Sequence, residues 1–590
     1  MFLKKFIIRN FRAIDVLELD FKKGLNIIIG ENNSGKTAVM DALRLCLGDF
    51  QQPRDIYCTK YDFRVDKSTL EEKIENIEFD LYFECENSLE VAWFNSLHAV
   101  DSEGNHSLQL HFRYELVDFK SDKRVKRTVW GGENEGGKVP FEVRSALRNV
   151  YLGALKDANK NLRPNQSNIL GKLYSNITLD NDKDKDQAKK DKLLKSLTEV
   201  LVADEWEEFI KKGNDSILEH LEYLFYLSAE KDVKIGFTPF EFDKFVQRLI
   251  MQLPVYSKKL IGTDHSSQQY FEIWQNGLGL NNLIYTAAVL GDIKQKKDIF
   301  KEEYNLLLIE EPEAHLHPQL QNTYFNYLKK LDQNDDFQII VTSHSPTIAA
   351  KTDLNLLTIL KNDENCICST QICKIDLDDN NLKFLQKFLD VTKSQLFFAN
   401  GVILVEGISE ALLIPIFSRI LGEQYDVERN GIEVVNINGV AFEHFAKLFN
   451  SDDKKRLESR CAIVTDDDEG KDGAEERVKK IEGYESGNLE SKIGKKTFEY
   501  ELFINNSNNQ CLLDIIESLH PIKFKEINDS SIDLEERGDI LVTTLSNSQN
   551  KSEFAYLLAI ELEKDNKFHN FVVPSYIENA IKFVVDGSSS

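Results

Sequence analysis

A glycine-rich loop between a strand-like and a helix-like segment constrains this chain more than any other feature. The apolar stretch 25–29 reads LNIII, the loop follows at 30–37, and a helical pattern of apolar residues begins at Ala38. Glycines let such a loop curl so that several backbone N–H groups point to one position, where the helix N-terminus adds partial positive charge. In the pattern G-x4-G-K-T the lysine contacts the β- and γ-phosphates of a nucleotide, and the threonine hydroxyl ligates Mg²⁺. The loop therefore predicts an ATP site, made by Gly30, Asn32, Asn33, Ser34, Gly35, Lys36 and Thr37.

A later acidic strand end offers carboxylates for the same site. The apolar run 306–309 ends in Glu310 and Glu311. Nucleotide hydrolysis needs one acid for the Mg²⁺ shell and one for the attacking water, and we expect Glu310 and Glu311 to fill these roles in that order. His344 follows the apolar strand 337–341 and is expected to sense the γ-phosphate. Taken alone, a histidine after a strand is more often structural.

Changes in composition along the chain predict four segments. From about residue 156 the sequence becomes charged and rich in asparagine, and leucines at helical spacing follow. Strand and helix patterns resume near residue 245, and a new strand–turn–helix unit starts at Gly401. We expect 1–155 and 236–395 to form one domain, 156–235 a helical insertion, and 396–590 a second α/β domain. The insertion is either a dimerisation arm or a solvated helical excursion.

The charge of the chain limits the surfaces that it can present. With 73 basic and 98 acidic residues the net charge is −25, which argues against a surface that is basic all over and against non-specific membrane adhesion. A local basic groove is still compatible with DNA binding. One basic segment is either a candidate contact surface or a solvated hairpin, and it contains Lys120, Lys123, Arg124, Lys126 and Arg127.

The eight cysteines show no zinc-finger spacing and predict reduced thiols in a cytoplasmic protein. The first residues, MFLKKF, lack the apolar region of a signal peptide. No apolar run reaches the length of about 18 residues that a membrane span needs. We therefore expect no membrane partner.

Acidic residues follow two strand-like segments in the last third of the chain. Glu406 comes directly after the apolar run VILV, and Glu410 stands four residues on, a spacing that can bring both acids to one side of the strand end. Asp466 and Asp468 end a second apolar segment and share a face if the backbone stays extended, whereas Asp467 would point away. Neighbouring carboxylates repel each other at low dielectric, and a divalent cation relieves this repulsion. Oxygen ligands favour Mg²⁺ or Mn²⁺, although a triple-aspartate turn is also common as a solvated turn.

Three segments of the first 350 residues resemble motifs of one ATPase group. Residues 308–318, LIEEPEAHLHP, look like the Walker B motif and D-loop of the ABC-type ATPases related to the SMC and Rad50 proteins. Residues 10–12, NFR, are similar to the first strand of that group, which implies that Arg12 approaches the nucleotide. Residues 276–283, NGLGLNNL, resemble the signature motif, with Asn276 in place of the usual serine. The resemblance implies that Gly277 and Gly279 contact phosphate across a dimer.

The two acidic strand ends look like a Toprim domain. Glu406 corresponds to its glutamate, and Asp466 and Asp468 correspond to its D-x-D pair. Residues 396–407, LFFANGVILVEG, closely resemble the start of the Toprim domain in nucleases of the OLD (overcoming lysogenization defect) family.

Two further elements of this family resemble segments of the chain. Residues 497–499, TFE, are similar to the T-L-E motif with Phe498 in place of leucine, which implies that Glu499 is a metal ligand. Residues 550–555, NKSEFA, are similar to a K-x-E-F element in which glycine is commoner than Ser552. This element implies that Lys551 stabilises charge on the transferring phosphate.

The resemblance implies an α/β fold: an ABC-type (SMC/Rad50-like) ATPase head with a helical insertion, followed by a Toprim α/β domain with a mainly parallel sheet. The lobes of the ATPase would be 1–155 and 236–395, and the Toprim nuclease would be 396–590. Such a chain would be an ATP-binding DNA endonuclease of bacterial antiphage defence. Two Mg²⁺ or Mn²⁺ ions would act at the scissile phosphate, held by Glu406, Glu410, Asp466, Asp468 and Glu499.

The resemblance also implies partners. These are DNA, further copies of the chain in a dimer or tetramer, and an accessory protein. The accessory protein would be helicase-like, as in Gabija systems, or a reverse transcriptase with its RNA–DNA product, as in retrons. The alternative function is an SMC/Rad50-like DNA-binding ATPase scaffold whose Toprim domain does not cut. The sequence leaves open the trigger, the DNA preference, and whether ATP drives or restrains cutting.

Overall fold

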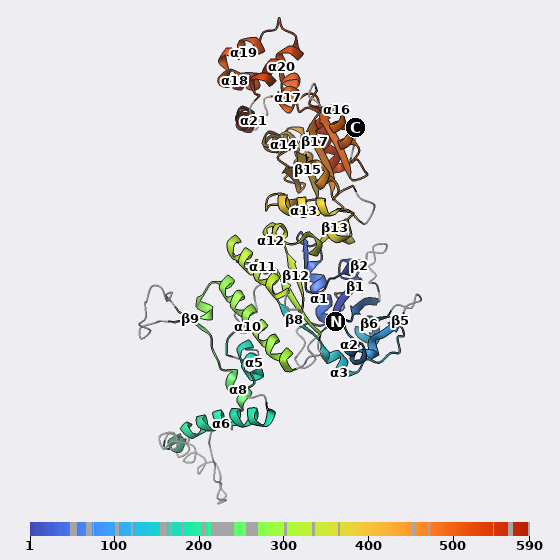
Figure 1. Cartoon of the computed structure of the whole chain (residues 1–590), viewed down its shortest axis with the longest axis vertical. Coiled ribbons are helices and arrows are strands. Elements are labelled where there is room, and N and C mark those ends of the chain that lie inside the picture. Colours follow the sequence, from blue (N-terminus) through green and yellow to red (C-terminus); the bar gives the residue numbers. More distant parts are fainter. Residues whose placement is uncertain are drawn as a thin grey trace, which may run out of the picture. The chain divides into compact units, whose positions relative to one another are not determined.

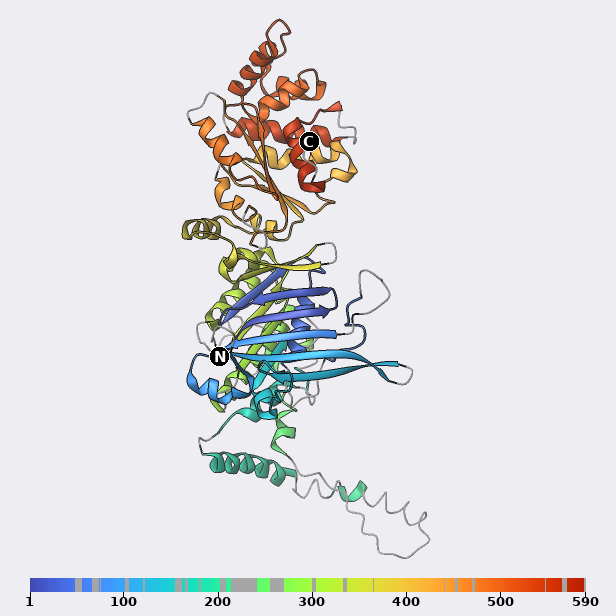
Figure 2. The ribbon, with the colours of Figure 1, turned by 90° about the vertical axis from the view of Figure 1, so that its right-hand side faces the viewer.

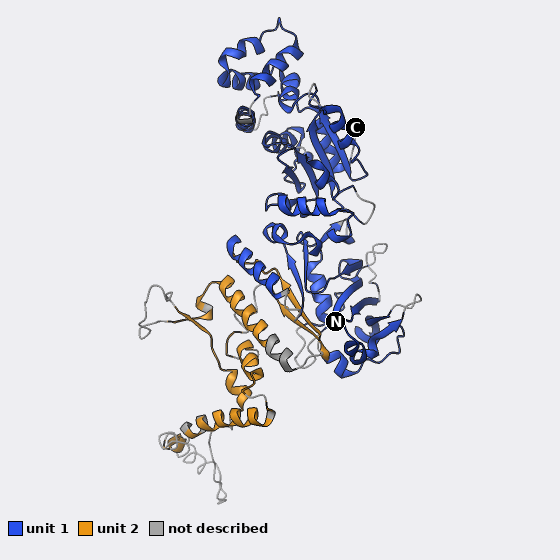
Figure 3. Cartoon of the chain, viewed as in Figure 1, with its two compact units in different colours: residues 1–145, 318–590 blue, residues 146–317 orange. Residues whose placement is uncertain are grey.

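The structure is a computed structural model in two compact units, residues 1–145 with 318–590, and residues 146–317 (Figure 3). The predicted insertion 156–235 lies in part outside the described residues. The structure describes residues 1–47, 56–65, 74, 76–100, 106–119, 122–153, 162–164, 168–179, 182–201, 208, 210–213, 241–254, 270–299, 304–332, 337–363, 366–439, 441–450, 455–469, 473–546, 548–564 and 570–587.

An antiparallel sheet occupies the start of the first unit (Figure 2). Apolar and polar residues alternate along its strands, so one face of each strand is buried. In β4, for example, Ile77, Phe79 and Leu81 are fully buried while the residues between them are not. The strand order is β2-β1-β4-β6-β5, with β7 paired to β6. The strands are β1 (Phe2–Phe11), β2 (Ile14–Asp20), β4 (Asn76–Glu84), β5 (His98–Val100), β6 (His106–Phe119) and β7 (Asp122–Gly131).

The predicted basic segment falls largely on β7. Its Arg124 guanidinium lies 3.7 Å from the centre of the Phe119 ring, and the Lys126 ammonium lies 3.0 Å from Glu115 on the paired strand. Lys120 lies outside the described residues. The segment is therefore a partly neutralised hairpin, and its role as a DNA contact stays a prediction.

Parallel strands in the first unit carry the glycine-rich loop. All six residues of β3 (Leu25–Gly30) are buried, which is typical of a central parallel strand. It pairs in parallel with β12 (Gln338–Ser343) and with β13 (Leu357–Asp363), and β13 pairs with β14 (Cys366–Gln371) in the antiparallel sense. The loop after β3 leads into α1 (Lys36–Cys46).

The β13–β14 hairpin lies against the glycine-rich loop. A Cβ atom on Gly30 would stand 2.3 Å from the carbonyl oxygen of Leu360, and one on Gly35, whose φ is +93°, would stand 2.6 Å from the Ile367 side chain. The next residue of β13, Lys361, donates to the Asn400 carbonyl at 3.2 Å and to the Ser459 hydroxyl at 2.9 Å. One hairpin therefore contacts both the loop and the residues before two strands of the C-terminal domain.

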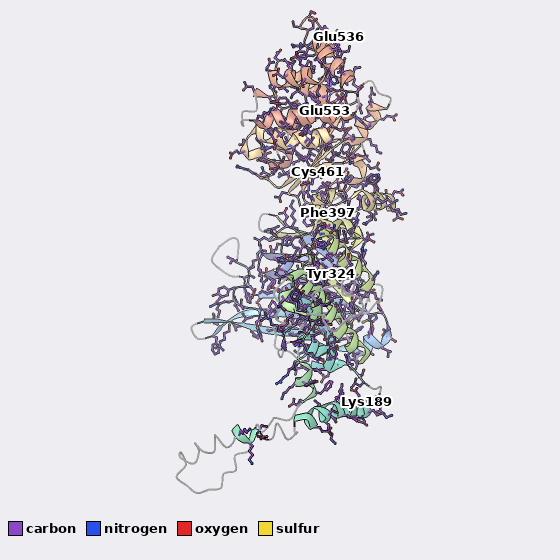
Figure 4. All side chains as sticks on the ribbon, turned by 90° about the vertical axis from the view of Figure 1, so that its left-hand side faces the viewer. Lys189, Tyr324, Phe397, Cys461, Glu536 and Glu553 are labelled. Atoms are coloured by element: carbon purple, nitrogen blue, oxygen red, sulfur yellow. The ribbon has the colours of Figure 1, made fainter. Side chains whose placement is uncertain are left out.

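The C-terminal domain is built on a four-stranded sheet in which every pairing is parallel. Its order is β16-β15-β17-β18, from β15 (Gly401–Val405), β16 (Ile432–Asn436), β17 (Arg460–Asp466) and β18 (Leu489–Gly494). Cys461, labelled in Figure 4, is buried on β17. The mainly parallel sheet that the sequence analysis expected is confirmed.

Helices cover this sheet and extend from it. One of them, α22, packs against three strands, and α17 to α20 group together beyond the sheet (Figure 1). The helices are α14 (Ile408–Leu421), α15 (Phe442–Ala446), α16 (Ala474–Glu482), α17 (Phe498–Asn506), α18 (Gln510–Leu519), α19 (Pro521–Ile527), α20 (Leu534–Thr544), α21 (Ser548–Glu563) and α22 (Ser575–Asp586).

The second unit combines a parallel strand pair with helices. Strands β8 (Leu147–Leu152) and β11 (Tyr304–Glu310) pair in parallel, and β9 (Gln252–Pro254) pairs with β10 (Tyr270–Glu272). Helix α5 packs against α10 and α8. The Asn176 amide donates to Asp292 at 2.7 Å, which ties α5 to α10. The helices are α5 (Ile169–Asn176), α6 (Lys183–Leu201), α8 (Phe242–Val246) and α10 (Leu278–Ile299).

The remaining helices lie in the first unit or at its border. They are α2 (Ser88–Trp93), α3 (Phe141–Ala146), α11 (Pro318–Asp332), α12 (Pro346–Lys351) and α13 (Asp379–Phe388). Short 3-10 turns are η1 (Asn95–Leu97), η2 (Ile273–Gln275), η3 (Leu354–Leu356), η4 (Ile372–Lys374), η5 (Lys393–Phe397) and η6 (Glu423–Tyr425). All eight cysteines are free thiols. Among the helices described, none combines the length and the apolar character that crossing a bilayer requires.

Replacing Gly30 by alanine should destabilise the ATPase half of the chain. The added methyl group would meet a backbone oxygen, so β13 or the loop must shift, at a cost of roughly 1–3 kcal/mol. Thermal unfolding followed by circular dichroism measures the effect. The matched control is Gly136→Ala, because nothing lies within 4 Å of that position. Equal melting temperatures for the two variants would contradict the close approach.

Candidate active site

Two parallel strands bring their acidic ends to the same edge of the C-terminal sheet. Strands β15 and β17 are direct neighbours, with Val405 paired to Val464. Glu406 follows β15, and Asp466 is the last residue of β17. Glu410 lies in the first turn of α14 and is buried. The acids therefore converge because the carboxyl ends of parallel strands lie together.

A third segment adds a carboxylate at this edge. Gly494, the end of β18, pairs with Asp466, and the Thr497 hydroxyl caps α17 by accepting from the N–H of Tyr500 at 3.3 Å. The cap places Glu499 in the first turn, where it is only 2% exposed. The N–H of Phe498 donates to the Asp466 carboxylate at 2.9 Å. The T-F-E segment thus joins Glu499 to the strand end of Asp466.

Burial and the charges of neighbouring acids raise the pKa values of three of these carboxylates. Burial raises the pKa of Asp466 well above its usual range. Negative charges raise it further, and they belong to Glu410, Glu406 and Glu499. Burial, followed by the charges of Glu499 and Glu406, raises the pKa of Glu410 to about 7. Burial also raises the pKa of Glu406, although the Thr465 hydroxyl donates to its carboxylate.

Lys551 joins the cluster from a fourth segment, α21. Its ammonium lies 2.7 Å from the Glu499 carboxylate. Burial alone would lower the pKa of Lys551, but Glu499, followed by Asp466 and Glu410, raises it above its usual value. The lysine therefore stays charged beside acids that come from three other stretches of the chain.

Arg477, on α16, contacts two acids of the cluster that Lys551 does not pair with. Its guanidinium lies 2.5 Å from the Asp468 carboxylate and 4.0 Å from the Glu406 carboxylate. It also donates to the backbone carbonyl of Asp466. Asp468 has a φ of +50°, so the backbone does not stay extended after β17, and the turn brings this carboxylate to the guanidinium.

Asp467 has a different role from its two neighbours. Its carboxylate accepts from the N–H of Glu469 at 2.9 Å and from the N–H of Lys496 at 2.7 Å. Its own N–H donates to the Gly494 carbonyl at 2.9 Å. Asp467 therefore holds two loops together.

The donors at this sheet edge fit a divalent cation by their chemistry. All five are carboxylates. Burial, and then the negative charges of neighbouring acids, raises the pKa values of Glu410 and Asp466, and a divalent charge relieves that repulsion. As the side chains stand, no three histidine, cysteine, aspartate or glutamate residues among those described are close enough to hold an ion. Arg477 and Lys551 hold three of the five acids instead, which are Asp468, Glu406 and Glu499.

Three residues of this site were missed in the sequence analysis. Arg477 belongs to the charged segment AEERVKKIE, which is typical of a solvated helix and gives no signal of a site. Thr465 lies between the apolar run and the acids, and a hydroxyl at that position gives no signal of a site. Tyr576 on α22 is buried with its ring against Gly494, and its hydroxyl has no hydrogen-bond partner among the described residues. Burial, then Asp466 and Glu410, raises its pKa.

The lysine of the glycine-rich loop donates hydrogen bonds to oxygen atoms of the same loop. The Lys36 ammonium donates to the carbonyl of Gly30 at 2.8 Å, to the carbonyl of Glu31 at 2.6 Å and to the Ser34 hydroxyl at 3.2 Å. Thr37 is the second residue of α1, Gly35 precedes the helix, and Asn32 and Asn33 lie in the turn before it. The Lys36 ammonium therefore lies inside the loop. The phosphate of a bound nucleotide would replace these oxygens as its hydrogen-bond acceptor.

Arg12 and His344 come from strands beside this loop. Arg12 follows β1 with a φ of +53°, and two aspartates hold it: Asp41 of α1 at 2.8 Å and Asp62 at 2.8 Å. His344 follows β12, whose last residue pairs with Ile29 just before the loop. Both side chains belong to the first unit with the loop.

The other predicted nucleotide residues lie in the second unit. Glu310 ends β11, and the Tyr151 hydroxyl of β8 donates to its carboxylate. Glu311 has a φ of +46°. Helix α10 begins at Leu278, directly after Gly277, and a Cβ atom on Gly279 would stand 2.5 Å from the carbonyl oxygen of His315. The signature-like helix therefore packs on the loop that follows the acidic strand.

The glycine-rich loop after β3 and the acidic cluster of the C-terminal sheet are the features expected of an ATPase joined to a Toprim domain, and known families match both parts. Residues 1–349 match the family described as AAA ATPase domain, which is more than half of the chain. Residues 397–468 match the family described as Overcoming lysogenization defect protein-like, TOPRIM domain. The chain therefore belongs to the OLD nuclease family, as the sequence analysis predicted, in which an AAA ATPase domain precedes an OLD-like Toprim domain.

Curated relatives agree with this assignment. The OLD nuclease of Thermus scotoductus is 23% identical over 458 residues, which cover 74% of this chain and 78% of the relative. The Old nuclease of Escherichia phage P2 is 22% identical over 461 residues, 74% of this chain and 73% of the relative. The endonuclease GajA of Bacillus cereus is 28% identical over 228 residues, and this chain spans only 32% of its length.

Replacing Glu410 by glutamine should stabilise the chelator-treated protein at high pH. The folded pKa of about 7 exceeds the usual value of 4.5, so Glu410 costs no stability below pH 4.5. Its ionisation opposes folding increasingly between these values, and above pH 7 the cost reaches about 3 kcal/mol. Denaturant unfolding at pH 4.5 and pH 8 measures the difference.

The control for this prediction is Glu443→Gln. Glu443 pairs with Lys480 at 2.7 Å, and that contact lowers its pKa. Its replacement should give no gain at pH 8. A Glu410→Gln protein that is no more stable than the wild type at pH 8 would contradict the crowding of carboxylates.

Proposed function

We propose that this chain is an ATP-binding, divalent-metal-dependent DNA endonuclease of bacterial antiphage defence. The observation that carries the proposal is the convergence of acids from separate segments on one sheet edge beside Lys551. Membership of a nuclease family supports it, because relatives that align over most of the chain are named as nucleases.

The residues at the sheet edge would divide the work of phosphodiester hydrolysis. Bound Mg²⁺ or Mn²⁺, in two sites, would activate water and stabilise the leaving 3′ oxygen. The ions would be held by Glu406, Glu410, Asp466, Asp468 and Glu499. Lys551 would donate to the scissile phosphate and offset the negative charge that develops on it. Thr465 would orient Glu406 through its hydroxyl.

The ATPase half would control assembly or cutting. Glu310 would support the Mg²⁺ bound with ATP at Thr37, Glu311 would polarise water, and Gly277 and Gly279 would contact ATP bound to a second copy of the chain. We therefore propose a dimer or tetramer that acts on DNA in the cytoplasm. An accessory helicase-like protein, or a reverse transcriptase with its RNA–DNA product, would supply recognition.

Purified protein with supercoiled plasmid and Mg²⁺ or Mn²⁺, with and without ATP, tests the nuclease. Wild type should nick or linearise the plasmid, and Asp466→Asn should cut about 100-fold more slowly or worse, because it removes charge from the ion sites. The matched control is Asp467→Asn. It changes the adjacent carboxylate, whose bonds are to backbone N–H groups, and should stay within a few-fold of wild type.

Equal rates of plasmid cutting by wild type and Asp466→Asn would contradict the assignment of this sheet edge as the nuclease active site. Tight DNA binding and ATP turnover without any cleavage would instead identify an SMC/Rad50-like scaffold with a non-cleaving Toprim domain.

Replacing Lys36 by alanine should weaken ATP binding about tenfold or more, because a charge-assisted contact to phosphate is lost. Isothermal titration with ATP and Mg²⁺ measures the affinity. Lys4→Ala is the control, because Lys4 pairs with Glu84 on the antiparallel sheet. Undiminished affinity in Lys36→Ala would contradict the role of the loop.

A further inference from the structure

Arg477 contacts Asp468 and Glu406, two of the acids that the proposed function assigns to the ions. Its guanidinium is 2.5 Å from one carboxylate and 4.0 Å from the other, and it also donates to the backbone of Asp466. Ligand oxygens surround Mg²⁺ at about 2.1 Å, so an ion and this guanidinium cannot occupy the position together.

The two cationic side chains pair with some acids of the cluster and not with others. Lys551 neutralises Glu499, and Arg477 neutralises Asp468 and approaches Glu406. Among the described residues no ion pair is made to Glu410 or Asp466, and these two acids repel each other. A first ion would gain most beside Glu410 and Asp466, whereas a second ion at Asp468 must displace a cation that is already present.

The contacts of Arg477 allow such a displacement. The buried Nε atom makes no hydrogen bond among the described residues, so only the two terminal nitrogens hold the side chain at the acids. The side chain remains 20% exposed. A rotation toward solvent would therefore break contacts at the tip alone and leave α16 in place.

We propose that Arg477 is a resident cation in the second of the two ion sites, and that it competes with the second divalent ion for Asp468 and Glu406. This inference rests on the proposed metal-dependent function. The site then binds one ion readily and a second ion only when the guanidinium withdraws. Arg477 is a positioning residue that sets the metal concentration at which both ions are bound.

Titration of the full-length protein with Mn²⁺, without nucleotide and followed by electron paramagnetic resonance of free Mn²⁺, tests this competition. Wild type should show one tight and one weak class of site. In Arg477→Gln the weak class should tighten about tenfold or more, with the tight class unchanged. The matched control is Lys480→Gln, which removes a positive charge from the same helix at a residue paired to Glu443 and should titrate as wild type.

A weak class that is unchanged or weaker in Arg477→Gln would overturn the inference. Arg477→Met replaces it if circular dichroism shows that the glutamine variant does not fold. Mn²⁺ binding by the Asp466→Asn protein shows whether the competition by Arg477 is wrong or the proposed metal site itself is wrong. If it binds as much Mn²⁺ as wild type, the metal site itself is wrong. If it loses the tight class while Arg477→Gln behaves as wild type, only the competition is wrong.

Discussion

Repulsion between carboxylates at one edge of a parallel sheet is the constraint on which the C-terminal domain depends. All five residues of β15 and the central residues of β17 are buried, so the fold places the acidic ends of these strands in a poorly hydrated position where like charges interact strongly. The raised pKa values of Asp466, Glu410 and Glu406 are the result. Lys551 on α21 and Arg477 on α16 oppose this repulsion by pairing with different acids of the cluster. Cations, whether they are side chains or ions, lower the free-energy cost of holding these ionised acids together.

Much of this arrangement could be predicted from the sequence because its causes are local. An apolar run that ends in acids predicts a buried strand with carboxylates at its end, and this holds for Glu406 and Asp466. The glycine-rich loop at Gly30 is defined by its own spacing. Family membership and fold class are confirmed, whereas the domain boundaries and the roles of the site residues stay predictions.

The remainder depends on tertiary structure that no local pattern encodes. Glu499 and Lys551 were reached only by resemblance, because a single acid in a helix and a single lysine in another carry no signal of proximity. Arg477 was missed because its helix has the charge pattern of a solvated surface. The sequence predicted that Asp466 and Asp468 share a face only if the backbone stays extended. The positive φ of Asp468 shows instead that a turn follows Asp466, and Asp468 pairs there with Arg477.

The β13–β14 hairpin has a mechanical consequence for the two halves of the chain. Because the Leu360 carbonyl lies against Gly30, a movement of Gly30 toward β13 would displace that strand. Lys361 would carry that displacement to Asn400 and Ser459, where two strands of five and seven residues begin. The β13–β14 hairpin is therefore a direct physical connection between the glycine-rich loop and the two strands that carry Glu406 and Asp466.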